Sequence, residues 1–394
     1  MAESTLREVV ETLAPLERGA GSEGERWAAD WIADRLRAAG AAARVEAVQY
    51  RHGYARVLGP LGAVGMIAGA RALLTGRGRK TVTVIAGLAG LAMADDVDNR
   101  WRVWRRLTTR PRTTTNVVAE IGDVAADRTL VVLAHHDAAP TGWIFDPSLQ
   151  RAIARRFPRV IERVNTSLPL WWPVLGASLL VSLGAIANRR GVLAAGTAAG
   201  VVNTAIAADI GRNRIVPGAN DNLSAVAALV DLAERIRDRP VPGLRVIVAS
   251  CGAEEVLQGG IYDFVERHLR PLDPARTSVL NLDTIGSPRL VMLEGEGVLR
   301  IEEYPGRPFR DLIAETAAAE GIALVRGQRA RTSTDSVIPS RAGYPTATVT
   351  SFEPDTKLLS NYHLLTDTPE NLDFATVREA VDLTEALARR MAVA

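Results

Sequence analysis

Apolar and polar residues alternate with two different spacings along this chain, one typical of helices and one typical of strands. Apolar residues three or four positions apart predict amphipathic helices over 4–14, 23–39, 223–237, 260–268, 308–320 and 376–391. Short runs rich in Val, Ile, Leu and Thr predict strands over 43–50, 116–121, 129–134, 244–250, 278–283, 290–293 and 346–350. Strands that alternate with helices indicate an α/β domain with a largely parallel sheet.

Two regions, residues 52–112 and 143–213, interrupt this alternation of strands and helices. Each contains a pair of apolar segments joined by a basic tip, and the four segments are 57–74, 81–94, 168–188 and 192–208. The third segment has about 20 residues without a charge, which is the length that spans a bilayer. We therefore expect two apolar helical hairpins inserted into one catalytic domain that occupies residues 1–394.

Two interpretations of these hairpins stay open. They could be buried helices that form a lid or a dimer interface, or a membrane anchor of up to four spans. Trp171 and Trp172, between Pro169 and Pro173, suit a lipid interface and suit a protein core equally well.

The distribution of basic residues predicts a topology for the membrane interpretation. The tips carry only Arg77, Arg79, Lys80, Arg189 and Arg190. The bases carry Arg51, Arg56, Arg100, Arg102, Arg105, Arg106, Arg155, Arg156, Arg159, Arg163, Arg212 and Arg214. The positive-inside tendency then places the catalytic domain in the cytoplasm. If the hairpins form a lid or a dimer interface, the expectation is a soluble cytoplasmic protein.

Composition narrows the class of protein. The chain has 394 residues, of which 47% are hydrophobic and 23% charged, and this excludes a disordered or collagen-like chain. The net charge of +2 gives no reason to expect a nucleic-acid partner. A single cysteine, Cys251, cannot form an intramolecular disulfide. The first 15 residues lack a basic start followed by an apolar run, so no signal peptide is expected.

Residues able to carry chemistry gather at the predicted ends of strands. His135, His136 and Asp137 follow the strand over 129–134, and ligands of α/β sheets bind at the carboxyl ends of strands. A histidine with an aspartate two positions later suits a metal ligand that a carboxylate orients. Local hydrogen bonds explain such a histidine as well.

Two acidic motifs follow further along the chain. Asp221 lies between two asparagines just before a predicted helix, where it could also be a helix cap. Glu254 and Glu255 follow a buried strand, and adjacent buried carboxylates are costly unless a cation or a proton accommodates them. One of them could bind a metal while the other acts as general base. A solvated acidic pair at a helix start is the alternative.

Asp283, after a strand, and His363, in a polar loop, are unremarkable when taken singly. Together with the preceding motifs they supply two histidines and three or four carboxylates, all expected at one edge of the sheet. Such ligands, without thiolates, fit a pair of hard-to-borderline cations bridged by a carboxylate. A metal pair of this kind activates water for attack on a carbonyl group.

The order of these motifs resembles the di-zinc aminopeptidase family of clan MH. The matching residues are His135-His136-Asp137, Gly218 to Ser224, Glu254-Glu255, Asn281-Leu282-Asp283, His363, Ser333-Thr334-Asp335 and Gly343-Tyr344-Pro345. The resemblance covers about residues 1–51, 113–142 and 214–394 and leaves out both insertions. It implies a three-layer α/β/α sandwich with a mostly parallel central sheet.

The resemblance also implies a role for each matching residue. Two zinc ions would be held by His135, Asp221, Glu255, Asp283 and His363, with Asp221 as the bridge. His135 and Asp283 would complete one site, and Glu255 and His363 the other. Glu254 would be the general base, Asp137 would orient His135, and Tyr344 could contact the substrate or the tetrahedral intermediate. His136 fills a variable position and is not expected to be a ligand.

The function implied is a zinc-dependent aminopeptidase that removes N-terminal residues from peptides by metal-assisted hydrolysis. One alternative is a relative of the glutaminyl cyclases, which share the fold and use one zinc for intramolecular acyl transfer. A second alternative is a non-catalytic membrane or binding protein of the same fold. The insertion over 143–213 lies between the first ligand and the bridging aspartate, so we expect it at the rim of the active site.

Overall fold

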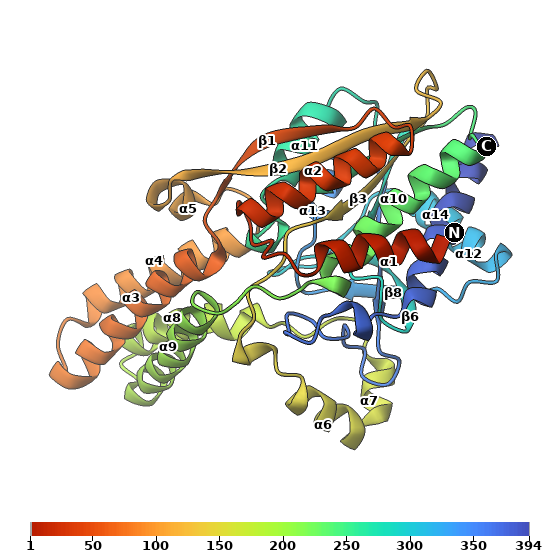
Figure 1. The fold of residues 1–394 in the computed structure, drawn as a ribbon. Coiled ribbons are helices and arrows are strands. Elements are labelled where there is room, and N and C mark those ends of the chain that lie inside the picture. The colour runs from red at the N-terminus through yellow and green to blue at the C-terminus, as the bar shows by residue number, and fades with distance from the viewer. Residues whose placement is uncertain (1, 394) are drawn as a thin grey trace.

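The central sheet of the molecule contains nine strands over residues 2–393, the part of the chain that the computed structural model describes (Figure 1). Its order is β1-β2-β4-β3-β5-β9-β6-β7, and β8 pairs with β6. The strands are β1 (Arg44–Arg51), β2 (Pro111–Gly122), β3 (Thr129–His135), β4 (Arg245–Cys251), β5 (Thr277–Leu282), β6 (Arg289–Glu296), β7 (Glu302–Glu303), β8 (Val325–Ala330) and β9 (Thr346–Phe352).

The parallel part of the sheet is its centre. β3 pairs in parallel with β4 and β5, and β5 pairs in parallel with β9, whereas β1, β2 and β6 join their neighbours on this path in antiparallel fashion. β7 and β8 were not expected from the sequence. β7 has only two residues, and β8 (VRGQRA) contains a glycine and three polar residues, so neither shows a period of two.

Helices cover both faces of the sheet, which confirms the predicted three-layer sandwich. Along β3, Leu130 and Val132 point into one hydrophobic core, while Val131 and Leu133 point into the other. The first core includes α1 (Ala2–Leu13), α2 (Glu23–Ala38), α10 (Ser224–Asp238), α12 (Arg307–Ala319) and α14 (Phe374–Val393). The second includes α11 (Ile261–Phe264), η4 (Val265–Leu269) and α13 (Val337–Arg341).

Both insertions form helical hairpins, and the two hairpins pack together as one bundle. The bundle helices are α3 (Tyr54–Thr75), α4 (Arg79–Val97), α8 (Trp171–Ile186) and α9 (Arg190–Ile210). α3 packs against α4 and α9, and α8 packs against the same two helices. Figure 1 shows this bundle projecting from the sandwich at the lower left. The rest of the insertions forms α5 (Val103–Thr108), η1 (Trp143–Phe145), α6 (Ser148–Arg156) and α7 (Pro158–Arg163).

Glycines allow the bundle helices to approach closely. A Cβ atom on Gly184 would lie 2.4 Å from the backbone nitrogen of Leu193, and one on Gly196 would lie 2.6 Å from that of Val181. Small residues at helix contacts are typical of helices that associate in membranes.

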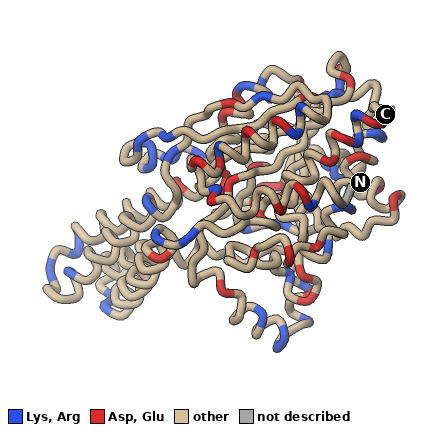
Figure 2. The backbone as a smooth tube through the Cα atoms, viewed as in Figure 1, with Lys and Arg blue, Asp and Glu red and all other residues tan. Residues whose placement is uncertain are grey.

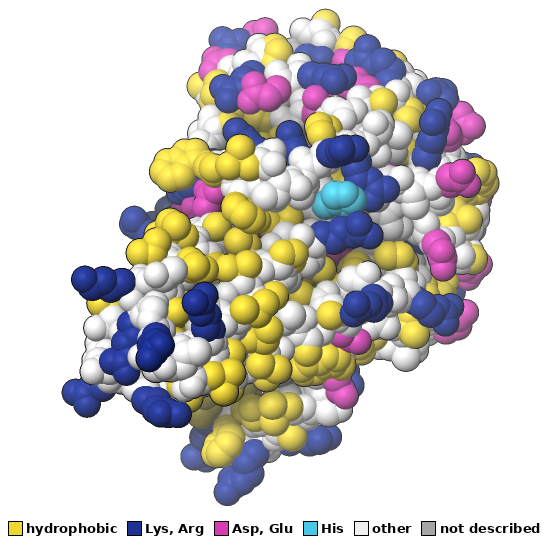
Figure 3. Space-filling model, turned by 90° about the vertical axis from the view of Figure 1, so that its left-hand side faces the viewer, with side chains coloured by type: hydrophobic (Ala, Val, Ile, Leu, Met, Phe, Trp, Pro, Cys, Tyr) yellow, Lys and Arg dark blue, Asp and Glu magenta, His cyan; other side chains and the backbone are white. Residues whose placement is uncertain are grey.

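The outside of the bundle is apolar. Exposed side chains include Leu74 (87%), Ile186 (69%), Leu91 (63%), Leu88 (61%) and Ile67 (61%). Figure 2 shows few charges along the bundle and basic residues at its tips, whereas charges of both signs cover the sandwich. Figure 3 shows the same apolar surface from the side. By length and composition α3 and α9 could each cross a membrane, and α8 is a shorter apolar helix.

The base of the bundle is tied to the sandwich by a buried arginine. Arg105 donates to both carboxylate oxygens of Asp96, at 2.8 and 2.9 Å, and to the carbonyl oxygen of Val256 at 3.1 Å. Val256 directly follows Glu255. The first hairpin is therefore joined to the loop that carries the acidic pair.

Candidate metal centre

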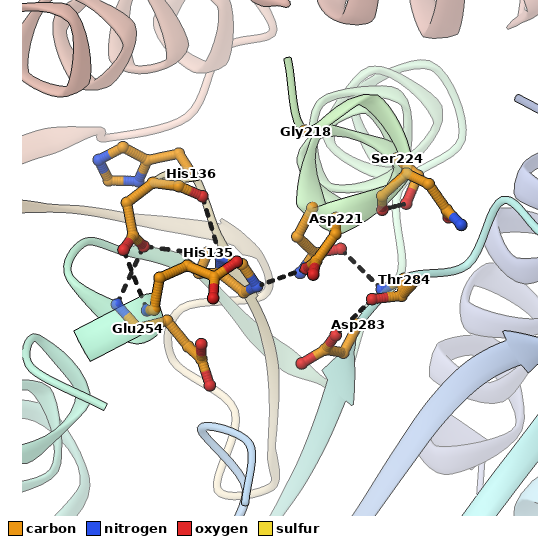
Figure 4. A network of polar contacts seen from close by, with 12 residues as sticks. His135, His136, Gly218, Asp221, Ser224, Glu254, Asp283 and Thr284 are labelled. Atoms are coloured by element: carbon orange, nitrogen blue, oxygen red, sulfur yellow. Dashed lines mark hydrogen bonds and ion pairs between the residues drawn. The ribbon is translucent and has the colours of Figure 1, made fainter. Parts of the chain in front are cut away.

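Three segments that follow strands or precede a helix bring acidic and histidine side chains together. His135 ends β3, Asp283 follows β5, and Asp221 lies in the turn η2 (Ala219–Leu223) before α10. Figure 4 shows these three side chains converging from their separate elements. The parallel strands β3 and β5 are neighbours, so the sheet itself places His135 beside Asp283.

Asp221 lies between two histidines. Its Oδ1 is 3.3 Å from His135 Nε2, and its Oδ2 is 3.4 Å from His363 Nε2. The same nitrogen of His363 is 3.2 Å from Glu255 Oε2. Each oxygen of one carboxylate therefore faces a different histidine, which is the arrangement that a carboxylate bridging two cations requires.

The potential ligand atoms form overlapping groups. Within residues 2–393, three sets have ligand atoms that all lie within 4.8 Å of one another: His135, Asp221 and Asp283; Asp221, Glu255 and His363; and His135, Glu254 and Glu255. The first two sets share Asp221. They contain the same residues that the family resemblance assigns to the two zinc sites.

Asp137 holds the acidic pair in place. Its Oδ1 accepts a hydrogen bond from the backbone nitrogen of Glu254 at 2.9 Å, and its Oδ2 accepts one from that of Glu255 at 3.0 Å. Asp137 Oδ1 is also 3.5 Å from His135 Nδ1. This fully buried carboxylate thus orients one candidate ligand and the turn η3 (Glu254–Val256) that carries two further site residues.

Asp367 holds the turn that carries Asp221 in place, a role that the sequence did not suggest. Its two carboxylate oxygens accept hydrogen bonds from the backbone nitrogens of Asn220 and Asp221, at 2.8 and 3.1 Å. Asn222 fixes the other side of the turn, because it donates to Leu282 O at 3.1 Å and accepts from Thr284 N at 2.9 Å. The only signal for Asp367 in the sequence is its place in the polar loop after His363.

Aromatic rings surround His363 and were also missed. Tyr362 stacks on His363 with ring centroids 3.9 Å apart, and Phe145 meets the same imidazole edge-on at 4.4 Å. Phe145 belongs to the second insertion, so this insertion does reach the rim of the site as expected.

Two residues of the matching motifs lie elsewhere. His136 turns away, and its Nδ1 is 2.9 Å from Ser250 Oγ (Figure 4). The hydroxyl of Tyr344 donates to the carbonyl oxygens of Leu269 and Leu272, at 2.5 and 3.1 Å, and its ring is buried in the second core. The structure therefore does not bring Tyr344 to the cluster, because packing against η4 occupies the side chain.

The cluster holds an excess of buried acid. Burial raises the pKa of Glu254 well above its usual range, and neighbouring acids, Asp335 foremost, add to this effect. Burial also raises the pKa of Glu255 to about 7, although His363 opposes it. Burial alone would lower the pKa of His363, but Glu255 and Asp221 raise it to about 10. Cations would relieve the repulsion among these carboxylates.

The donor set fits zinc. Glu255 Oε1 and His363 Nδ1 are buried without a hydrogen-bond partner. Such atoms are costly in a protein interior unless an ion satisfies them. Histidine and carboxylate ligands suit zinc. The one cysteine nearby, Cys251, is buried, and burial raises the pKa of its thiol well above the usual range, so it offers no thiolate.

Two cavities reach the acidic pair. The first, of about 180 Å³, is lined by His135, Asp221, Asp283 and by residues of β6, β8 and β9. The second, of about 160 Å³, is lined by His363 and by apolar side chains of the bundle. Glu254, Glu255 and Tyr362 line both.

Comparison with known proteins identifies the fold and finds a family match over part of the chain. Residues 203–388 match peptidase family M28. No curated protein matches the chain significantly.

Solved structures match nearly the whole chain at low sequence identity. A zinc aminopeptidase from Bacillus subtilis is 16% identical with a TM-score of 0.58, covering 99% of this chain and 94% of its own. An aminopeptidase from Aneurinibacillus sp. strain AM-1 is 14% identical with a TM-score of 0.57, covering 98% and 92%. A glutaminyl cyclase from Bacteroides thetaiotaomicron is 13% identical with a TM-score of 0.58, covering 98% and 97%.

The match over residues 203–388 includes Asp221, Glu254, Glu255, Asp283 and His363, and the shared fold extends to His135. The recognition from the motif series is thereby confirmed: residues 203–388 match the M28 peptidases, and the fold is that of zinc aminopeptidases and glutaminyl cyclases.

Proposed function

We propose that this protein is a di-zinc aminopeptidase that hydrolyses N-terminal residues from peptides. The observation that carries the proposal is the position of Asp221, whose two oxygens face His135 and His363 separately. A cyclase with a single zinc would need only one of these two groups of ligands.

Five residues of the chain would hold the metals. His135 and Asp283 would bind one zinc ion, Glu255 and His363 the other, and Asp221 both. Zinc ions bound there would polarise the substrate carbonyl and lower the pKa of water. Asp137 and Asp367 act indirectly, because their hydrogen bonds to the backbone hold Glu255 and Asp221 in position.

Glu254 would move the proton. It lies within the group formed with His135 and Glu255, and its Oε1 accepts a hydrogen bond from Gln258 Nε2 at 2.8 Å. This bond fixes the orientation of the carboxylate. Glu254 takes a proton from the attacking water and delivers it to the leaving amine nitrogen as the C–N bond breaks.

The test is activity against a panel of aminoacyl reporter substrates, together with the zinc content of the purified protein. We expect cleavage of at least one substrate, loss of activity with a chelator, recovery on adding zinc, and two zinc ions per chain. A protein that binds two zinc ions and cleaves nothing in the panel would contradict the proposal.

A glutaminyl-cyclase-like activity is the second candidate, because the fold is equally close to such enzymes. It predicts one tightly bound zinc ion and ring closure of an N-terminal glutamine with release of ammonia. Mass spectrometry of a peptide that begins with glutamine separates the two candidates, since cyclisation removes 17 Da and hydrolysis removes the residue.

We also propose that the bundle spans a lipid bilayer and that the sandwich lies on the cytoplasmic side. α3 and α9 have 22 and 21 residues, which at 1.5 Å per residue gives a length of about 30 Å. Only 17% of the apolar window of α9 is buried. Exposed tryptophans lie near the base, Trp172 at the start of α8 and Trp101 just after α4, as in a headgroup belt.

Membrane extraction tests the location. We expect the full chain in the membrane fraction, released by detergent and not by high salt or carbonate. Full recovery in the soluble fraction would instead support the lid or the dimer interface, and size-exclusion chromatography would then tell those two apart.

A further inference from the structure

The second cavity lies beneath the bundle, between Glu254 and Glu255 on one side and the inserted helices on the other. Its apolar wall comes from α3, η1, α8 and α9 and includes Leu58, Ile144, Trp171, Val174, Ile206 and Ile210. Tyr54 and Trp171 meet edge-on there, with ring centroids 5.4 Å apart. Both insertions therefore contribute to one apolar chamber next to the proposed base.

Among residues 2–393, the only charged residues that line the chamber are Glu254, Glu255 and the candidate ligand His363, whereas Asn203, Gln258, Thr332 and Ser333 line it as uncharged polar residues. A charged substrate group placed among the apolar residues would lose its hydration without finding a partner. An aromatic or branched aliphatic side chain would bury apolar surface at no such cost. The volume of about 160 Å³ suits one such side chain, because a cavity of about 150 Å³ lined by apolar residues accommodates benzene.

The two cavities suit the two sides of a scissile bond. The first cavity contains His135, Asp221, Asp283 and Glu255, which belong to both proposed metal sites, so the carbonyl under attack and its acyl residue fit there. The chamber contains Glu254 with only Glu255 and His363 of the ligands. Because Glu254 lines both cavities, the amine that accepts its proton fits the boundary between them, and the residue attached to that amine fits the chamber.

We propose that the chamber beneath the bundle binds the side chain of the second residue of the substrate, and that the enzyme prefers peptides with a large apolar residue there. This inference rests on the proposed aminopeptidase function. In the reaction, the oxygen of water bonds to the carbonyl carbon, the C–N bond breaks, and the amine of the second residue gains a proton. The freed peptide then begins with the residue held in the chamber.

The first test varies only the second residue of a peptide series while the best N-terminal residue is kept. With the full-length zinc-loaded protein in detergent, we expect kcat/KM to be about 10-fold or more higher for Leu or Phe than for Gly or Asp, as for other apolar pockets. Cleavage with no dependence on the second residue would overturn this inference and leave the aminopeptidase proposal intact. Absence of any cleavage would overturn both.

Filling the chamber should remove the preference. Ile206→Trp places a larger side chain in the wall, so we expect kcat/KM to fall for peptides with Leu or Phe second and to change little for those with Gly second. Val201→Trp is the matched control, because Val201 lies on the same helix, is 52% exposed and does not line the chamber. Equal losses for both variants, or for both peptide classes, would count against the inference.

A binding measurement gives a readout that does not depend on turnover. A peptide with a diazirine-bearing leucine in second position is cross-linked to the Glu254→Gln protein and the adduct is mapped by mass spectrometry. Labels on α3, α8 or α9 support the assignment of the chamber. Labels confined to the strand residues Val291, Leu293 or Phe352, which line the first cavity, would overturn it.

Discussion

The sandwich and the bundle depart from ordinary globular packing in opposite directions. The sandwich buries acids, with Asp137 fully buried, Asp221 4% exposed and Glu254 8% exposed. The bundle leaves large apolar side chains open, with Leu88 61% and Leu91 63% exposed on one helix. Inside the sandwich carboxylates lie where apolar residues are usual, and the surface of the bundle is apolar where polar residues are usual.

Each departure indicates a partner outside the chain. Buried carboxylates are costly unless a cation or a proton neutralises them. An extended apolar surface is costly in water and is the usual mark of a binding or membrane-facing region. The same reasoning supports both proposals, metal ions at the centre of the sandwich and lipid around the bundle.

The strongest test of the comparison introduces charge on the bundle. In a bilayer, Leu88→Lys with Val201→Lys should destabilise insertion by about 3 kcal/mol for each lysine. We expect the double variant to leave the membrane fraction or to accumulate poorly. Val124→Lys with Leu299→Lys is the control on the exposed surface of the sandwich. If both pairs behave like the unaltered protein in fractionation, the bundle does not contact lipid, because surface lysines in water change stability little.

The next test removes the acid that should carry the proton. Glu254→Gln is expected to lower kcat by about 10²- to 10⁴-fold, the usual contribution of a general acid–base group. Its zinc content should stay at the value of the unaltered protein, because Glu254 is not assigned as a ligand. Unchanged kcat would exclude Glu254 as the base, and loss of zinc would assign it to the metal instead.

A smaller effect is expected at the carboxylate that supports Asp221. Asp367→Asn keeps the size of the side chain but weakens its two hydrogen bonds to the backbone of the turn. We expect zinc affinity to fall by about 10-fold, as is common for residues that position ligands. Titration against a competing chelator measures this, with the exposed Glu370→Gln in the same loop as the control. Equal affinities of the two variants would show that the turn holds its shape without Asp367.

The last test concerns a buried acid away from the cluster. Glu296 accepts a hydrogen bond from Thr334 N at 2.7 Å, and burial raises its pKa to about 8. The folded state therefore binds a proton that the unfolded state releases near pH 4.5. Its stabilising contribution is complete below that pH and is lost as the pH rises through about 8.

Glu296→Gln should remove this pH dependence. We expect the variant to lose less stability than the unaltered protein between pH 5 and pH 8, by roughly 1 kcal/mol per pH unit. Thermal unfolding at several pH values, with zinc held constant, measures the difference. Parallel pH profiles would mean that Glu296 is already ionised in the fold, and that buried acid in the sandwich does not need a neutralising partner.

Much of the sandwich was predictable because its patterns are local. The apolar run that ends at His135 and the strand before Asp283 can each be recognised from a few consecutive residues. Because β3 and β5 are parallel neighbours, their carboxyl ends lie close together. The strands β7 and β8 could not be expected, since their pairing with β6 depends on a neighbour and not on their own sequence. The sequence also did not predict that β1, β2 and β6 run antiparallel to their neighbours, because the direction of a strand depends on the strand it pairs with.

The sequence by itself determined the order of the motifs, the strand ends that carry them, and the apolar character of both insertions. Only the tertiary structure decided that the two insertions form one bundle, that Asp367 supports Asp221, and that Tyr344 is taken up by the second core. The physical reason is that side-chain type and spacing are local properties of the chain. Which distant segment satisfies a buried group is settled by packing, and packing couples residues that lie far apart in sequence.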